Sequence, residues 1–217
     1  MYVLVMGSKN YSSWSIRPWL AMRVAGIPFS DIVIHLDKPD TSELIRAHSP
    51  SGLVPVLKDR EISVWDSLAI IEYLNERHPE AVLWPAAPEE RARARSVSAE
   101  MHSGFLPLRR ECPMNLSREP RPIAVSDDVK ANVARIERIW ADCRAAGQER
   151  GGPFLFGPFC AADAMFAPVV NRLHVYGLPV SRLSRAYMDA VMALPAWAEL
   201  ARVAGAEPRS AKYDEVG

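Results

Sequence analysis

The sequence contains little cysteine, and its few cysteines form no recognisable pattern. Its 217 residues include only Cys112, Cys143 and Cys160, and no two of them make a CxxC pair. An odd, sparse set of this kind excludes a disulfide-stapled scaffold, provides no metal site and suits a reducing compartment. We therefore expect a cytoplasmic protein without a bound metal.

The sequence also lacks an excess of charge and a long apolar run. Lysine and arginine total 26, aspartate and glutamate also total 26, and the formal net charge is +0. Proteins that hold nucleic acid usually have a clear basic excess, and no stretch approaches the roughly 18 apolar residues of a membrane span. The first six residues have neither the basic segment nor the cleavage site of a signal peptide. We expect a protein that binds neither nucleic acid nor a membrane.

The first part of the chain alternates strand and helix signals. A valine-rich run at 2–6 predicts a buried strand, and with the next two elements it predicts a β-α-β unit whose strands are parallel. The complete expected order is strand, helix, strand, helix, strand, strand and helix, at residues 2–6, 14–25, 31–36, 41–48, 56–57, 62–64 and 67–78. This order is typical of a thioredoxin-like α/β domain.

The composition changes after this segment. Residues 79–88 are rich in proline and lack periodicity, which indicates a linker, and no convincing strand follows. The expected later elements are helices at 89–109, from 126 to a break at 151–153, from 160 or 161 to 176, at 185–193 and at 196–203, a loop at 112–125 and a loose tail at 210–214. Pro107 lies within the first of these helices, so we expect a kink or stop near it. The sequence thus predicts a thioredoxin-like domain at 1–80, a linker at 81–88 and an all-α helical domain at 89–217.

Four polar residues stand between the first strand and the first helix: Asn10, Tyr11, Ser12 and Ser13. The free N–H groups and the dipole at a helix N-terminus favour an anion. A hydroxyl directed at a thiol in this position stabilises the thiolate, because a thiol with a pKa of about 8.5 needs only a modest downward shift to ionise at neutral pH. The alternative is that Ser12 or Ser13 only caps the helix.

A proline, Pro55, stands at the start of a predicted strand, where it cannot donate a hydrogen bond to the sheet. A cis Val54–Pro55 bond would explain its presence and would turn the N–H and C=O groups of Val54 outward, toward a peptide-like ligand. The alternative is an ordinary trans proline at a strand start, which the rarity of cis bonds favours.

The pair Asp66 and Ser67 directly precedes the next predicted helix. The serine hydroxyl and the N–H groups at the start of this helix are suited to receive a carboxylate, as at other helix N-termini. The simpler alternative is that the two side chains only cap the helix.

Taken together and in this order, these features resemble the glutathione transferase family. The pairs Ser49-Pro50 and Val54-Pro55 and the segment 66–74 are similar to zeta-class members, which include maleylacetoacetate isomerase. The segment 157–168 resembles the capping box that opens the family's central helix. The resemblance implies a thioredoxin-like domain followed by a helical domain, a homodimer, and glutathione as co-substrate or cofactor.

The resemblance also implies roles for individual residues. Val54, beside a cis Pro55, would bind the cysteinyl backbone of glutathione through its main chain. Ser67 would hold the γ-glutamyl carboxylate through its hydroxyl and N–H groups, and Asp66 would face the γ-glutamyl ammonium. Lys38 is the candidate partner of the glycyl carboxylate.

The loop before the first helix departs from the zeta pattern. An ungapped match places Asn10 where the family has its activating serine, and a shift of one or two residues places Tyr11 or Ser12 there. We favour Ser12 because it stands just before the helix, and Ser13 follows it as a further candidate. Asn10 would instead donate an amide N–H to the sulfur.

The second departure is Cys160, which stands where the family usually has serine or threonine as a helix cap. A thiol accepts hydrogen bonds weakly. Asp163 is still able to accept from the backbone N–H of the cap residue, so we expect a cost of up to about 1 kcal/mol in stability and none in activity.

The predicted helix at 89–109 offers side chains to a second substrate. Met101 and Phe105 would shape an apolar pocket, and His102 and Arg109, which share a helix face with Phe105, would meet an anionic acceptor. The alternative is that Met101 and Phe105 pack between helices and that His102 is an ordinary interface residue.

Three functions are consistent with these features. The first is a glutathione transferase with a role in detoxification, in which the thiolate attacks an electrophilic, largely apolar small molecule. The second is a glutathione-dependent cis–trans isomerase of a maleyl-type dicarboxylate, which His102 and Arg109 favour. The third is a non-catalytic binding protein of the same family, which Asn10 at the ungapped catalytic position favours. We expect the first function, in a homodimer.

Overall fold

Four strands from the first 65 residues form one mixed sheet. In the computed structural model, which describes residues 1–215, β1 (Tyr2–Gly7) pairs in parallel with β2 (Phe29–Ile34). The antiparallel strands β3 (Val56–Asp59) and β4 (Ile62–Trp65) complete the spatial order β2-β1-β3-β4. The parallel β1–β2 pairing confirms the predicted β-α-β unit.

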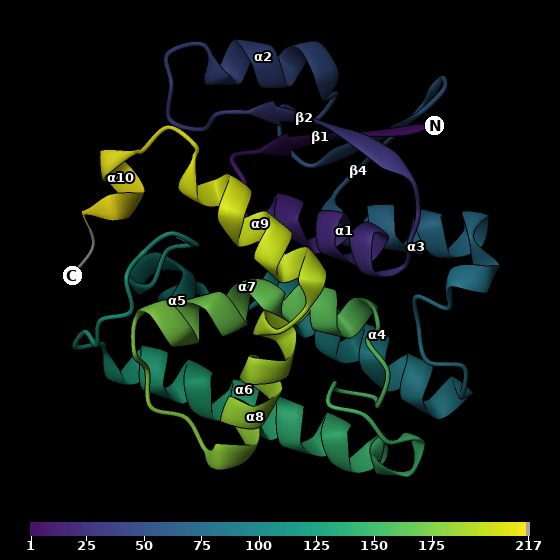
Figure 1. Ribbon diagram of the computed structural model, residues 1–217, viewed down its shortest axis with the longest axis vertical. Coiled ribbons are helices and arrows are strands. Elements are labelled where there is room, and N and C mark those ends of the chain that lie inside the picture. The colour runs from purple at the N-terminus through teal and green to yellow at the C-terminus, as the bar shows by residue number, and fades with distance from the viewer. Residues whose placement is uncertain (216–217) are drawn as a thin grey trace.

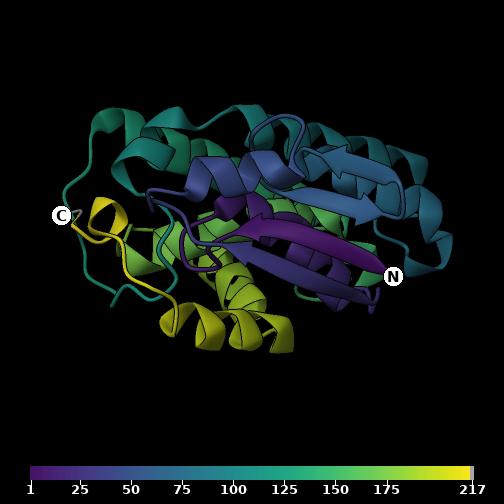
Figure 2. The ribbon, with the colours of Figure 1, turned by 90° about the horizontal axis from the view of Figure 1, so that it is seen from above.

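Helices cover both faces of this sheet (Figures 1 and 2). Helices α1 (Ser13–Val24) and α3 (Ser67–Arg77) pack on one face, and α2 (Thr41–His48) packs on the other. Because successive strand residues point to opposite faces, Leu4 of β1 joins the main core with α1 and α3, whereas Val5 joins a smaller core with Ile45 of α2. This is the thioredoxin-like arrangement that the sequence predicts.

The rest of the chain is helical and lies below the sheet in Figure 1. Its elements are α4 (Pro88–Ser103), α5 (Leu106–Glu111), α6 (Asp127–Ala146), α7 (Ala161–Val175), α8 (Arg182–Met192), α9 (Pro195–Gly205) and α10 (Ala211–Asp214), with short 3-10 turns at Pro79–Ala81 and Gln148–Arg150. The predicted fold class, an α/β domain followed by an all-α region, is confirmed. None of the helices within residues 1–215 has the length and apolar character that a membrane crossing needs.

Helix α7 joins the two parts of the molecule. It packs against α1 and against α4, and nearly all of its side chains are buried. At its start, the Asp163 carboxylate accepts hydrogen bonds from the backbone N–H groups of Cys160 at 2.8 Å and Leu155 at 3.0 Å. The predicted contact of Asp163 with the cap residue is therefore confirmed.

The predicted helix at 89–109 is divided between α4 and α5, and the kink or stop expected near Pro107 is confirmed. Gly104 ends α4, and a side chain there would lie 2.8 Å from the Glu100 carbonyl oxygen. Phe105 then adopts a positive φ of 61°, and Pro107 lies in the first turn of α5, where its missing N–H is not needed. The break turns the chain away from the α4 axis immediately after His102.

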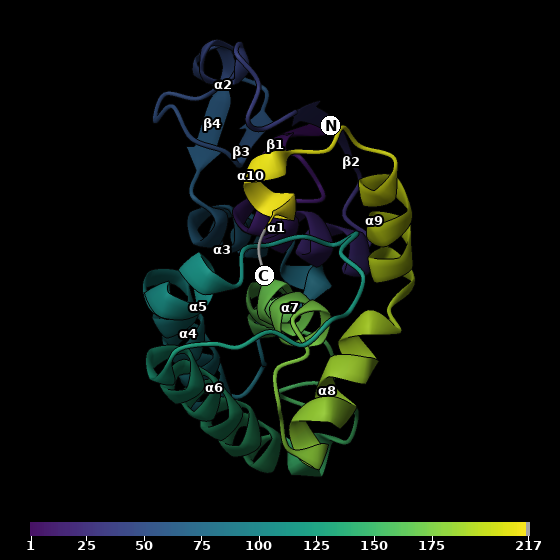
Figure 3. The ribbon, with the colours of Figure 1, turned by 90° about the vertical axis from the view of Figure 1, so that its left-hand side faces the viewer.

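The prediction of a loose tail at 210–214 is wrong. Residues 211–214 form the short helix α10, which lies next to α1 in Figure 3. The Tyr213 ring stacks on Tyr11 with 4.8 Å between ring centroids, and Ser210 N–H donates to the Tyr11 hydroxyl at 3.1 Å. These contacts join segments about 200 residues apart, which no local pattern reveals.

Candidate functional site

A cavity of about 510 Å³ opens where the starts of β3 and α3 meet helix α4. Its walls are formed by Trp14, Ser51, Leu53, Val54, Pro55, Trp65, Asp66, Ser67 and His102. The sheet domain supplies every one of these residues except His102, which extends from α4. The fold therefore brings together four predicted glutathione-binding residues and one residue predicted for the acceptor.

Val54 and Pro55 form the wall of the cavity just before β3. The peptide bond between them is cis, as the resemblance implies. The exposed side chain of Leu53 precedes them at the rim of the cavity. The proline thus stands at the entry to a strand, where the sheet needs no donor from it.

Asp66 and Ser67 lie at the N-terminus of α3. Asp66, with a positive φ of 74°, caps the helix: its Oδ1 accepts from the N–H groups of Leu68 at 2.8 Å and Ala69 at 3.2 Å. Ser67 is only 1% exposed, and its Oγ has no hydrogen-bond partner among residues 1–215. A buried hydroxyl without a partner costs about 1–3 kcal/mol, so Ser67 is suited to a polar group of a ligand.

His102 connects the helical domain to this helix start. Its Nε2 lies 2.9 Å from Asp66 Oδ2, and its Nδ1 lies 3.4 Å from Nη1 of Arg17. Burial lowers the pKa of His102, and the positive charges of Arg17 and Arg109 lower it further, while Asp66 opposes them. His102 is therefore neutral at pH 7.

Trp14 forms the aromatic part of the cavity wall and carries two guanidinium groups over its ring. The Cζ atoms of Arg17 and Arg109 lie 4.3 Å and 4.7 Å from the ring centroid, and His102 meets the ring edge-on at 5.0 Å. Arg17 is fully buried, and this burial lowers its pKa well below the usual value. Arg17 is not among the site residues predicted from the sequence, although its position three residues after Trp14, on the same helix face, was a signal.

Arg109, predicted to meet an anionic acceptor, is held by protein groups and is not among the cavity-lining residues within 1–215. Its Nε donates to the Gly104 carbonyl oxygen at 2.9 Å, its Nη2 donates to the Met101 carbonyl oxygen, and its guanidinium stacks on Trp14. Met101 and Phe105, which were also predicted for the acceptor pocket, are buried in the main core, because α4 packs against α7. Of the four predicted acceptor residues, only His102 is part of the cavity wall described above.

Asn10 is held by the C-terminal part of the chain. The backbone N–H groups of Lys9 and Asn10 each donate to the Glu207 carboxylate at 2.9 Å. The Asn10 side-chain oxygen accepts from the Ser117 N–H at 2.9 Å. These bonds turn Asn10 toward the loop after α5, away from the cavity.

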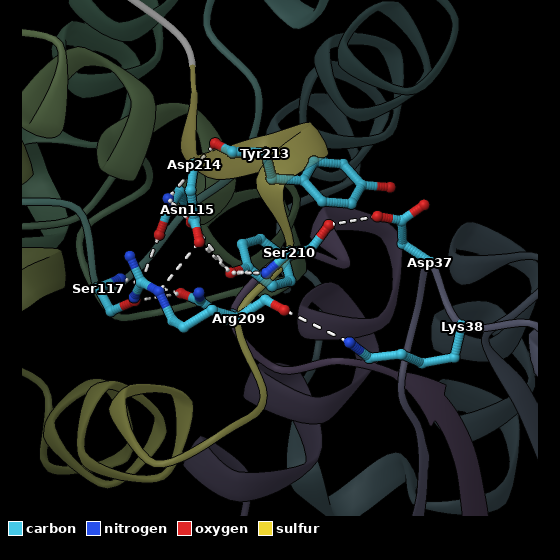
Figure 4. A network of polar contacts seen from close by, with 10 residues as sticks. Asp37, Lys38, Asn115, Ser117, Arg209, Ser210, Tyr213 and Asp214 are labelled. Atoms are coloured by element: carbon cyan, nitrogen blue, oxygen red, sulfur yellow. Dashed lines mark hydrogen bonds and ion pairs between the residues drawn. The ribbon is translucent and has the colours of Figure 1, made fainter.

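Tyr11 belongs to the same polar network, part of which is shown in Figure 4. Its hydroxyl donates to Asp214 at 3.0 Å and accepts from Ser210, and burial, as the largest cause, raises its pKa. Asp214 also accepts from Asn115 and Arg209. Tyr11 is therefore a structural anchor of the C-terminal segment.

Lys38, the predicted partner of the glycyl carboxylate, also lies in this network. Its Nζ donates to the Arg209 carbonyl oxygen at 3.4 Å, as Figure 4 shows. The neighbouring Asp37 accepts from the Ser210 hydroxyl at 2.6 Å. Lys38 is not among the residues that line the cavity within the described part of the chain.

Ser12 and Ser13 stand at the start of α1, two residues and one residue before Trp14. Ser12 occupies the cap position, but its hydroxyl makes no cap bond and donates instead to Ser15 Oγ at 2.8 Å. Ser15 Oγ in turn accepts from the Gly7 N–H at 3.1 Å. Ser12 and Ser13 are both buried, and neither is among the cavity-lining residues in the described part of the chain. The expected side-chain cap bond is absent.

The described residues contain no grouping of three or more histidine, cysteine, aspartate or glutamate side chains placed to hold a metal ion. The three cysteines are free and buried, and burial raises the pKa of Cys112 to about 11 and that of Cys143 to about 12. None of these thiols is a reactive thiolate at neutral pH.

Comparisons with known proteins agree with this geometry. Residues 11–77 match the model of the glutathione S-transferase N-terminal domain. The chain is 28% identical to glutathione S-transferase Z2 of Arabidopsis thaliana over 87% of this chain and 88% of the relative. It is 28% identical to a probable maleylacetoacetate isomerase of Vibrio cholerae, over 93% of this chain and 96% of the relative.

A similar solved structure is the holo form of maleyl pyruvate isomerase, described as a bacterial glutathione S-transferase in the zeta class. It has a TM-score of 0.72 and 24% identity, over 96% of this chain and 99% of that chain. Residues 11–77 thus match the N-terminal domain of the glutathione S-transferase family, and the relatives of the whole chain include a glutathione S-transferase and a probable maleylacetoacetate isomerase.

Proposed function

We propose that the cavity binds glutathione and that the protein transfers the glutathionyl group to an electrophilic, largely apolar small molecule. The observation that carries this proposal is the buried hydroxyl of Ser67, which has no partner among residues 1–215 and lies on the cavity wall. A γ-glutamyl carboxylate would accept its hydrogen bond at the positive end of α3. Asp66 would face the ammonium of the same group, and the main chain of Val54 would pair with the cysteinyl backbone.

Ser12 is the proposed partner of the thiolate. The side-chain oxygen of Asn10 accepts from Ser117 and the hydroxyl of Tyr11 donates to Asp214, so Ser12 is the loop hydroxyl favoured for this role. The buried Nδ2 of Asn10 has no partner within residues 1–215 and is the alternative donor to the sulfur. Its hydrogen bond to Ser15 would be exchanged for one to the sulfur when glutathione binds. The hydroxyl and the dipole of α1 would both stabilise the negative charge.

The apolar side chains around the cavity support an apolar acceptor. Trp14, Leu53 and Trp65 line it and are 37%, 69% and 46% exposed. The thiolate would attack the electrophilic carbon, a carbon–sulfur bond would form, and the leaving group would depart with its electron pair. The exposure of Leu53 and Trp65 also supports a homodimer, which light scattering at micromolar concentration tests.

An isomerase of a maleyl-type dicarboxylate is the second candidate, since one relative is described as a probable maleylacetoacetate isomerase. Such a substrate needs cationic partners. Arg109 is bonded to two carbonyl oxygens, and His102 is neutral and bonded to Asp66. The geometry therefore favours the transferase.

The test is a pH titration of the ultraviolet absorbance of the thiolate of bound glutathione. We expect a thiolate pKa well below that of free glutathione, and we expect Ser12→Ala to raise it. The same effect in Ser13→Ala and not in Ser12→Ala would assign the role to Ser13, the further candidate. Bound glutathione with an unshifted thiol pKa would indicate a non-catalytic binding protein, and the absence of binding would refute the proposal. Turnover of an apolar electrophile against that of a maleyl-type dicarboxylate separates transferase from isomerase.

A further inference from the structure

We propose that His102 is a positioning residue for Asp66, and that Arg17 holds His102 in the neutral Nε2–H form. The Asp66 carboxylate is thereby kept in place, and its negative charge is free for the ligand's ammonium. This inference rests on the proposed binding of glutathione. It assigns a role to His102 and Arg17, to which the proposed function gives none.

The hydrogen-bond chemistry of Arg17 determines the tautomer of His102. A guanidinium has donors only, so the contact of 3.4 Å between Arg17 Nη1 and His102 Nδ1 requires Nδ1 to be the acceptor. The neutral ring then carries its proton on Nε2. That N–H points to Asp66 Oδ2 at 2.9 Å and donates to it.

The surrounding side chains hold the imidazole in this orientation. Trp14 meets the ring edge-on at 5.0 Å, and Arg17, which is fully buried, stacks on the same indole. The charged groups that face His102 are Arg17 on α1, Asp66 at the start of α3 and Arg109 on α5. A proton on Nδ1 would point at the guanidinium of Arg17. Burial lowers the pKa of His102, and the charges of Arg17 and Arg109 lower it further.

A neutral histidine has a specific advantage at this position. Oδ1 of Asp66 is used by the helix cap, and Oδ2 receives the hydrogen bond from His102. A charged imidazolium would neutralise the carboxylate and compete with an ammonium for it. The neutral Nε2–H donor orients the carboxylate and leaves its charge uncompensated. His102 thus couples the helical domain to the proposed γ-glutamyl site.

Two substitutions of His102 separate this role from a merely structural one. In His102→Gln, the amide oxygen accepts from Arg17, the amide nitrogen donates to Asp66, and the side chain has no titrating group. In His102→Leu, both hydrogen bonds are lost. The control is His174→Gln, on α7 and outside the cavity wall. The probe is S-methylglutathione, whose blocked sulfur cannot ionise.

We expect His102→Leu to weaken binding of the probe about tenfold at pH 7.5, by calorimetry, because the carboxylate loses a hydrogen bond. His102→Gln should bind as tightly as the wild type. As the pH is lowered from 7.5 to the point at which His102 takes up its second proton, the wild type and His174→Gln should lose affinity about threefold, whereas His102→Gln should lose none. Equal binding by His102→Leu, or the same pH profile for His102→Gln and the wild type, would overturn the proposal.

Nitrogen-15 spectra of the imidazole in the ligand-free protein test the tautomer directly. We expect His102 at pH 7.5 to have a protonated Nε2 and an unprotonated Nδ1, and we expect Arg17→Met to raise the pH at which His102 takes up its second proton. A protonated Nδ1 in the wild type would overturn the assignment. If the wild type binds no S-methylglutathione, the proposed function fails as well; if it binds and His102→Leu binds equally, only the role of His102 fails.

Discussion

The substitution Ser67→Ala is expected to have opposite effects on glutathione binding and on the stability of the ligand-free protein. The Ser67 hydroxyl is buried, has no partner within residues 1–215 and lies on the cavity wall. In the ligand-free protein, no hydrogen bond from residues 1–215 replaces the bonds to water that this hydroxyl loses on burial. In the complex it would donate to a carboxylate.

The two magnitudes follow from the energy of hydrogen bonds. A hydrogen bond to a charged group contributes about 1.5–3 kcal/mol, and 1.4 kcal/mol corresponds to about a factor of ten in affinity. Ser67→Ala should therefore weaken glutathione binding roughly 10- to 150-fold. Removal of an unpaired buried hydroxyl should recover about 1 kcal/mol of the free energy of unfolding.

The measurements are calorimetry for binding and urea denaturation without ligand for stability. The matched control is Ser98→Ala, because Ser98 Oγ on α4 is also buried and has no partner in the described part of the chain, but it lies outside the cavity wall. This control should gain stability in the same way and bind glutathione unchanged. If Ser67→Ala binds as tightly as the wild type, the site assignment is wrong. If it instead unfolds more easily, Ser67 is not an unsatisfied group.

Three further predictions concern the rest of the chain. Cys160→Ser should raise the free energy of unfolding by about 0.5–1 kcal/mol, since a hydroxyl is the better helix cap; an unchanged urea midpoint would contradict this. Burial raises the pKa of Asp163 from 3.8 to about 6. The contribution of protonated Asp163 to the free energy of unfolding, on the order of 3 kcal/mol, is therefore fully present below about pH 4 and is lost as the pH rises through about 6. The free energy of unfolding of the wild type, relative to that of Asp163→Asn, should therefore be lower at pH 7.5 than at pH 4. The same difference at both pH values would be inconsistent with the raised pKa. Tyr11→Phe should speed amide hydrogen exchange in residues 207–214, because the hydroxyl bonds to Asp214 and Ser210 are lost, and should leave the thiolate pKa of bound glutathione unchanged; a raised thiolate pKa would assign Tyr11 to the sulfur.

The sequence predicts the sheet domain well because its signals are local. Alternating apolar residues, the cap Asp66 and the turn between β3 and β4 each act over a few residues. The resemblance extends these local signals to Val54, Pro55, Asp66 and Ser67, which do line one cavity. Their proximity in space follows from the β-α-β-α-β-β-α order, because that order brings the starts of β3 and α3 together.

Tertiary structure alone decided which polar groups remain available. The Asn10 side-chain oxygen and the Tyr11 hydroxyl have the same local setting as the Ser12 hydroxyl, but they bond to Ser117 and Asp214, which lie far along the chain. Such contacts depend on the path of the whole chain, for which a sequence window holds no information.

In helix α4 as well, tertiary structure decides which residues reach the cavity. The break at Gly104 and the packing on α7 bury Met101 and leave His102 at the cavity, although both residues belong to one continuous pattern in the sequence. The sequence determined which side chains are able to bind, orient or ionise a ligand. The tertiary structure decided which of them face the cavity, because burial and hydrogen-bond partners are properties of the assembled chain.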